Sequence, residues 1–158
     1  IDAATSSGMG PAAILRVKLK RLDAWNAARR RHAASYTEAL SNLPGITLTE
    51  YNDGTVYHLY VIRADDRDGL LAALNDAGIG AGIHYPFAVH ELKAYADLDH
   101  APGDFPVAED WARRGLSLPV YPELPETAVE RAASFSAIAA SIPSSRRRRG
   151  VPRVTLPS

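Results

Sequence analysis

The sequence contains no cysteine. Disulfide bonds and thiolate metal sites are therefore excluded, and a reducing compartment is permitted. No apolar run approaches the roughly 20 residues of a membrane-spanning helix, and the first residues lack the basic region and apolar core of a signal peptide. These absences predict a soluble, cytoplasmic protein with no membrane partner. The missing initiator methionine suggests a fragment or a processed chain.

The sequence also lacks the short motifs of self-contained enzymes. It has no HExxH pair, no GxSxG elbow and no Walker-type loop. Its three lysines, Lys18, Lys20 and Lys93, all lie outside the apolar strands that favour Schiff-base chemistry. We therefore predict no catalytic, cofactor-binding or metal-binding residue in this chain. A zinc site at His84 and His90 with an acidic residue is a minor alternative, because zinc needs three or four ligands.

Charge is distributed unevenly along the 158 residues. Residues 1–142 carry 18 acidic and 13 basic side chains, whereas the last residues carry five arginines and no acid. The hydrophobic fraction of 46% suits one globular domain at residues 12–142. We interpret residues 1–11 as a flexible lead-in and residues 143–158 as a basic, disordered tail. The tail has no interleaved aromatic residues, so nucleic acid is not an expected partner.

Hydrophobic periodicity predicts helices and strands in the first half of the chain. Apolar residues three or four apart indicate one helix of roughly 30 residues, from Ala12 to the Pro-Gly pair at residues 44–45. Residues 46–50 and 56–62 then predict an antiparallel hairpin. A helix capped by Asp65 or Asp66 follows and is closed by a glycine.

The second half of the chain is less regular. Residues 80–84 are expected to form a strand that returns to the same sheet. Residues 86–104 are predicted to be irregular, with Asp104 as the N-cap of the next helix. Residues 116–120 suit a short edge strand at best, and Pro125 begins a last helix. The pattern indicates an α/β protein of the α+β kind, with a short sheet covered by helices and one long N-terminal helix.

Residues 78–90 (GIGAGIHYPFAVH) hold the main candidate site. Three glycines at alternate positions allow another backbone or a ligand to approach closely. His84 and Tyr85 end the expected strand, Pro86 stops its hydrogen-bond ladder, and His90 follows. Polar groups at a strand end often bind ligands in mixed α/β folds. A strand that runs into a histidine-containing loop with no ligand remains an open alternative.

Five motifs resemble those of the DegT/StrS family of pyridoxal-phosphate-dependent nucleotide-sugar aminotransferases. They occur in that family's order and spacing, at residues 12–26 (AAILRVKLKRLDAWN), 56–62 (VYHLYVI), 78–86 (GIGAGIHYP), 103–109 (GDFPVAE) and 116–124 (LSLPVYPEL). The resemblance covers about residues 12–142 and implies the C-terminal small domain of a fold type I enzyme. Residues 4–11 depart from the family, which usually has there an Asn-x-Arg-x-Asp-x-x-Gln type run whose Asn reaches the partner subunit's cofactor phosphate.

The resemblance implies a function that this chain performs together with a large domain that its sequence does not include. Family members bind pyridoxal phosphate through a lysine on a large N-terminal domain, act on nucleotide-linked keto-sugars and form homodimers. We therefore expect this chain to hold no pyridoxal phosphate alone, to be inactive alone, and to contribute substrate contacts and dimer surface. The alternative is a stand-alone sugar-nucleotide-binding or regulatory module without catalysis.

The resemblance also implies roles for four side chains. His84 and Tyr85 match the family's strand-end pair, which lies near the substrate's sugar and phosphates. His90 matches the histidine after the Tyr-Pro turn, and a structural role for it is the alternative. His58 lies in the second expected strand and faces either the cleft or the core. We favour the core for His58.

Overall fold

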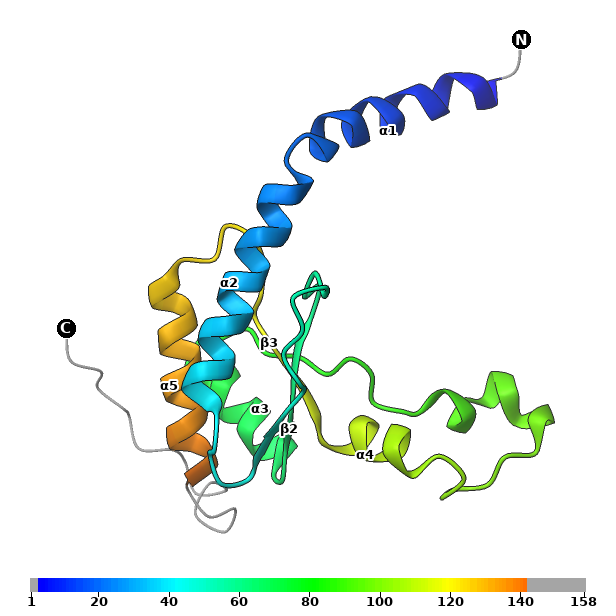
Figure 1. The fold of residues 1–158 in the computed structure, drawn as a ribbon. Helices are drawn as coiled ribbons and strands as arrows, with labels where there is room; N and C mark the ends of the chain where they lie inside the picture. Colours follow the sequence, from blue (N-terminus) through cyan, green and yellow to red (C-terminus); the bar gives the residue numbers. More distant parts are fainter. Residues whose placement is uncertain (1–2, 142–158) are drawn as a thin grey trace.

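The computed structural model describes residues 3–141, so the predicted tail at residues 143–158 lies outside the described residues. Helices and a small antiparallel sheet make up the body, and one helix and one long loop project from it (Figure 1). The elements are, in order, α1 (Ala3–Leu19), α2 (Leu22–Leu40), β1 (Ile46–Leu48), β2 (Tyr60–Ala64), α3 (Arg67–Asp76), the 3-10 helices η1 (Val89–Glu91) and η2 (Lys93–Leu98), α4 (Pro106–Arg114), β3 (Gly115–Leu118) and α5 (Glu126–Ser141).

The sheet has the order β1-β2-β3, and both strand pairs are antiparallel. The predicted hairpin is confirmed, with Ile46 paired to Ala64, but β2 begins at Tyr60 rather than at residue 56. Tyr57 has a positive φ of 48°, and its hydroxyl contacts both backbone groups of Asn52. These contacts hold the residues before β2 in a loop that cannot extend the ladder.

The third strand differs from the prediction. Residues 80–84 contribute only one isolated bridge, in which Gly82 and Ser117 exchange two backbone hydrogen bonds of 3.1 and 2.8 Å. The prediction that this segment returns to the sheet is thus confirmed at a single residue pair. β3 is wholly buried, with β2 paired along one edge and Gly82 bridged to the other.

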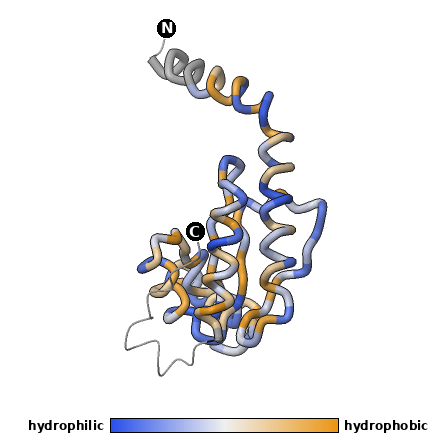
Figure 2. The backbone as a smooth tube through the Cα atoms, turned by 90° about the vertical axis from the view of Figure 1, so that its left-hand side faces the viewer, coloured by the Kyte–Doolittle hydropathy of each residue, from blue (hydrophilic) through white to orange (hydrophobic). Residues whose placement is uncertain are grey.

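The predicted N-terminal helix consists of two helices. α1 ends at Leu19 and α2 begins at Leu22, and the backbone between them tightens into a turn in which Arg21 N–H donates to the Lys18 carbonyl. α1 also begins at Ala3, within the segment that composition predicted as a lead-in. α1 points away from the body in Figure 1, and apolar residues continue along it in Figure 2. Its apolar side chains Ile14, Leu15, Val17 and Leu19 are all exposed.

Helix α3 has the ends that its sequence predicts. The Asp66 carboxylate accepts a hydrogen bond from Gly69 N–H at the first turn. At the other end Gly78 has φ of +72°, and Gly78 and Ile79 donate back to the carbonyls of Asn75 and Leu74. This is a Schellman motif, in which only glycine takes the left-handed conformation without a steric cost.

The core lies between one face of the sheet and helices α2, α3 and α5. Alternate residues of β2 are buried, so Tyr60, Ile62 and Ala64 face these helices while Val61 and Arg63 face the other side. Helix α4 and residues 86–104 lie on that other side (Figure 1). The large side chains with almost no exposed surface are Tyr36, Leu40, Ile62, Leu70, Leu74, Leu116 and Val129. The sheet therefore has one fully covered face and one partly open face.

None of the helices in the described part of the chain is long and apolar enough to cross a membrane.

Candidate functional site

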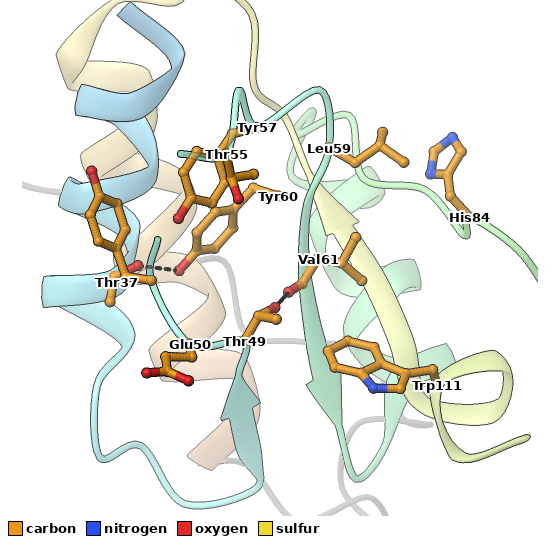
Figure 3. Close-up of a pocket in the computed structure, with 11 residues that line it drawn as sticks. Thr37, Thr49, Glu50, Thr55, Tyr57, Leu59, Tyr60, Val61, His84 and Trp111 are labelled. Atoms are coloured by element: carbon orange, nitrogen blue, oxygen red, sulfur yellow. Dashed lines mark hydrogen bonds between the residues drawn. The ribbon is translucent and has the colours of Figure 1, made fainter. Parts of the chain in front are cut away.

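A pocket of about 420 Å³ lies where the loop before β2 meets α2 and the partly open sheet face (Figure 3). Threonine hydroxyls, tyrosine rings, one imidazole and one indole line it. The lining residues are Thr37, Thr49, Glu50, Tyr51, Thr55, Tyr57, Leu59, Tyr60, Val61, His84 and Trp111. His84 is thus the one predicted site residue that reaches this pocket.

His84 is held at the pocket by β3. Its Nδ1 lies 3.0 Å from the hydroxyl oxygen of Ser117, which is only 4% exposed, whereas His84 itself is exposed. The ring lies beside Leu59 and above Trp111 in Figure 3. A Cβ atom at Gly82 would approach His84 Cε1 to 3.2 Å, so glycine leaves room for the imidazole. The glycine-rich segment and the buried serine together determine the position of this ring.

Tyr85 lies next to His84 but outside the lining of the pocket. The peptide bond between the two residues is cis, and the two rings meet edge to face with centroids 5.8 Å apart. Tyr85 is 74% exposed, the largest exposed fraction among the large hydrophobic side chains of the described residues. The structure therefore brings the predicted pair together and presents both rings at the surface.

His90 lies away from this pair, in contact with α4. Its Nε2 lies 3.1 Å from Glu109 Oε1, and its ring packs 4.8 Å from the ring of Phe105. The Gly103 N–H donates to the same carboxylate oxygen at 2.7 Å. That bond holds the pKa of Glu109 below its ordinary value, and further hydrogen bonds from Phe105 and His90 add to this effect, although desolvation opposes it. This geometry matches the structural alternative for His90.

The expectation that His58 faces the core is wrong. His58 precedes β2 and is exposed, while its neighbour Tyr57 is buried. Tyr57, which has a positive φ of 48°, takes the buried position, and the adjacent side chain of His58 lies at the surface. His58 does not line the pocket that His84 reaches.

Sequence reasoning missed the aromatic side chains around the pocket. Tyr36 stacks on Tyr60 with centroids 5.0 Å apart, Tyr57 lies 6.3 Å from Tyr60, and Tyr51 stacks on Tyr57 at 5.5 Å. The density of aromatic residues between residues 51 and 60 was a signal, but it is also typical of a strand. Only the folded loop shows that these rings form a continuous series from the core to the surface.

A second missed group surrounds Asp110 on α4. Arg63 donates to it at 2.9 Å, Arg113 at 2.8 Å and Arg114 at 3.4 Å, and the Arg63 guanidinium lies 4.8 Å from the ring centre of Trp111. Desolvation would raise the pKa of Asp110, but the hydrogen bond from Arg63 and the other arginine charges outweigh it and lower that pKa. These contacts fix α4, and with it Trp111, against the open sheet face.

The residues present do not fit pyridoxal phosphate or a metal ion as a complete site. Lys18, Lys20 and Lys93 are exposed, and none of them lines the pocket, so no amine is placed for a Schiff base there. Within residues 3–141, no three histidine, aspartate or glutamate side chains gather closely enough to ligate a metal ion. What the site offers is an imidazole, a phenol, threonine hydroxyls and aromatic faces, which suit the binding of a polar ligand.

Comparison with known proteins gives matches over most of the chain. The model of the DegT/DnrJ/EryC1/StrS aminotransferase family matches residues 10–135. The erythromycin biosynthesis sensory transduction protein EryC1 of Saccharopolyspora erythraea is 49% identical over 121 residues, which are 75% of this chain and 33% of that protein. The dTDP-3-amino-3,4,6-trideoxy-alpha-D-glucose transaminase of Streptomyces venezuelae is 44% identical over 115 residues, which are 72% of this chain and 30% of that protein.

Solved structures agree with these matches. The crystal structure of S. venezuelae DesV in complex with a ketimine intermediate superposes with a TM-score of 0.79 at 38% identity, over 84% of this chain and 36% of that one. An aminotransferase from Brucella abortus superposes with a TM-score of 0.73 at 34% identity, over 83% and 35%. This chain thus spans about one third of the length of the relatives that it matches. By sequence and by fold, it belongs to the DegT/DnrJ/EryC1/StrS aminotransferase family.

Proposed function

We propose that this chain is the C-terminal small domain of a nucleotide-sugar aminotransferase and contributes substrate contacts to it. The carrying observation is that Ser117 and a glycine-rich segment hold the exposed His84 at the pocket of Figure 3, with the exposed ring of Tyr85 beside it. Relatives are named as transaminases of a dTDP-sugar and of a UDP-sugar. The substrate class that fits is therefore a nucleoside diphosphate keto-sugar.

The hydrogen bond at Ser117 gives His84 a defined role in this proposal. If the Ser117 hydroxyl donates to Nδ1, the ring proton is on Nε2, which then donates to a diphosphate oxygen or a sugar hydroxyl. The Tyr85 hydroxyl, on an exposed ring, offers a second donor beside it. His58 is exposed and available for a contact outside the pocket, and the position of His90 against Glu109 makes it a supporting residue.

The amino-transfer chemistry itself belongs to the missing part of the enzyme. Pyridoxal phosphate, when bound, moves the amino group from a donor to the keto-sugar. The three lysines of this chain lie away from the pocket, so we propose that a large domain supplies the lysine and the cofactor site. The exposed apolar side chains of α1, such as Ile14 and Val17, supply a surface for that domain or for the second subunit of a homodimer.

Complementation tests this proposal directly. The chain is mixed with the separately expressed part of the S. venezuelae transaminase that it does not match, and amino transfer is measured with pyridoxal phosphate and a dTDP-keto-sugar. We expect activity from the pair, none from either part alone, and a loss of at least about tenfold with His84→Ala. Amino transfer by this chain alone, or a pair that associates but stays inactive, would contradict the proposal.

A stand-alone binding module remains the second candidate function. It is favoured by one observation, that residues of this chain line an open pocket of about 420 Å³. Calorimetry with dTDP- and UDP-sugars separates the two functions. Binding in the micromolar range by the chain alone, abolished by His84→Ala, would favour the module, whereas a half-site should bind far more weakly.

A further inference from the structure

Residues 86–104, called the arm below, form the longest connection in the described part of the chain. They follow Tyr85 and lead toward α4, and they project from the body in Figure 1. Every residue from 91 to 104 is exposed, and only the two short 3-10 helices η1 and η2 are regular. A segment with so little burial needs specific polar contacts to keep one conformation.

One carboxylate joins the two ends of the arm. Glu109 Oε1 lies 3.1 Å from His90 Nε2 at the outgoing end and accepts the Gly103 N–H at 2.7 Å on the return. The two side chains are largely buried, with His90 at 8% and Glu109 at 17% exposed. Gly103 has φ of +99°, which favours glycine and allows its N–H to reach the carboxylate. Residues 90–103 are thus closed into a loop by contacts with a single oxygen atom.

Aromatic contacts reinforce the same closure. The ring of Phe105 lies 4.8 Å from His90 and 4.9 Å from His100, so it sits against both ends of the arm. Asp104 accepts the Ala101 N–H at 2.9 Å, which forms a local turn at the return and explains why Asp104 does not cap α4 as predicted. These contacts orient the chain around Glu109, which is the one side chain among residues 3–141 with hydrogen bonds to both His90 and Gly103.

We propose that Glu109 is a positioning residue that closes the arm and, through His90, holds Tyr85 against His84. Four residues separate Tyr85 from His90, and within them Ala88 is buried and donates its N–H to Glu91. A chain anchored at Ser117 through His84 and at Glu109 through His90 leaves Tyr85 little freedom between the two anchors. The expected effect of Glu109 on substrate binding rests on the proposed function. The closing of the arm by Glu109 does not.

The closure is tested on this chain by hydrogen exchange and by NMR. In Glu109→Ala we expect exchange at the Gly103 amide, corrected for intrinsic rates, to rise about tenfold or more, because a hydrogen bond to a charged acceptor is lost. We also expect a weaker cross-peak between the His84 and Tyr85 rings, while exchange in β2 stays unchanged. Glu109→Gln keeps an acceptor oxygen and should retain most of the protection. Glu130→Ala, an exposed glutamate on α5, serves as the matched control.

Unchanged exchange at Gly103 and an unchanged His84–Tyr85 cross-peak in Glu109→Ala would overturn the proposal. So would exchange that rises equally in β2, because this would mean a loss of global stability instead of an open arm.

The complementation assay then tests the consequence for substrate. We expect Glu109→Ala to raise KM for the nucleotide sugar about tenfold with a smaller change in kcat, and Glu109→Gln to restore most of the loss. If the arm opens but KM is unchanged, Glu109 is a structural clamp and the positioning role is wrong. An inactive wild-type pair would instead contradict the proposed function, and the exchange and NMR results would still decide the closure.

Discussion

The imidazole of His84 lies 3.0 Å from the hydroxyl of Ser117, 33 positions later in the chain. The same Ser117 backbone bonds to Gly82, so one residue of β3 holds both the main chain and the side chain of the candidate site. A strand that is buried along its whole length is a rigid support. The position of His84 is therefore set by β3 instead of by its own exposed segment.

Removal of the Ser117 hydroxyl should release the imidazole. In Ser117→Ala we expect the His84 ring resonances to shift toward those of a free histidine. The free energy of unfolding should fall by only about 1 kcal/mol, since water can bond to the exposed ring. NMR and denaturant titration check the two effects. Ser35→Ala, which removes an exposed hydroxyl bonded to the Arg31 carbonyl on α2, is the control and should leave His84 unchanged.

The glycines before His84 should differ sharply in their tolerance of a methyl group. A Cβ at Gly82 would lie 3.2 Å from His84 Cε1, whereas a Cβ at Gly80 would meet nothing within 4 Å. Gly82→Ala should therefore displace the imidazole and weaken any ligand contact that depends on it, and Gly80→Ala should not. Crystal structures or His84 chemical shifts of the two variants provide the comparison. Equal effects would show that the close approach at Gly82 has no role in the site.

Tyr36 should make the fold sensitive to alkaline pH. Desolvation raises its pKa above the ordinary value, and the nearby Tyr60 and Tyr121 add to this effect. The buried phenol stays neutral in the folded chain, while the unfolded chain releases the proton near pH 10. The stabilisation is therefore present below about pH 10 and decreases as the pH rises further.

The variant Tyr36→Phe separates this effect from the loss of a hydrogen bond. The Tyr36 hydroxyl donates to the Pro119 carbonyl at 3.0 Å, so its removal should cost about 1–2 kcal/mol at pH 7. The same variant should show a smaller loss of stability between pH 9 and pH 11 than the wild type, as measured by urea unfolding. Tyr95→Phe, at an exposed ring in η2, should change neither quantity.

Asp110 should contribute stability that is lost in acid. Its carboxylate accepts from Arg63, Arg113 and Arg114, and these groups lower its pKa despite the opposing effect of desolvation. A lowered pKa gives stability that is fully present above the ordinary value of about 4 and is lost as the pH falls through the folded-state value. The urea midpoint of Asp110→Asn should therefore lie below that of the wild type at pH 7, and the two should converge at low pH. Asp97→Asn, on the exposed arm, should have no such effect.

Local features could be predicted from the sequence because neighbouring residues decide them. Asp66 caps α3 and Gly78 ends it through contacts within a few residues, and the β1–β2 pairing follows from two alternating segments joined by a turn. The five family motifs likewise identified the family, which the match over residues 10–135 shows. The pair His84 and Tyr85 was found because it ends the expected strand and lies within one of those motifs.

The remaining features depend on residues that are distant in the sequence. Ser117 of β3 bridges to Gly82, the Tyr57 hydroxyl bonds to the backbone of Asn52 in the loop that precedes His58, and His90 contacts Glu109 of α4. Residue type and spacing alone do not specify such contacts. Several residues could chemically serve as the partner of a given side chain, and only the fold brings one of them close. The sequence by itself determined the family, the two ends of α3 and the β1–β2 hairpin. Only the tertiary structure decided which histidine faces the pocket, which supports the arm and which faces the solvent.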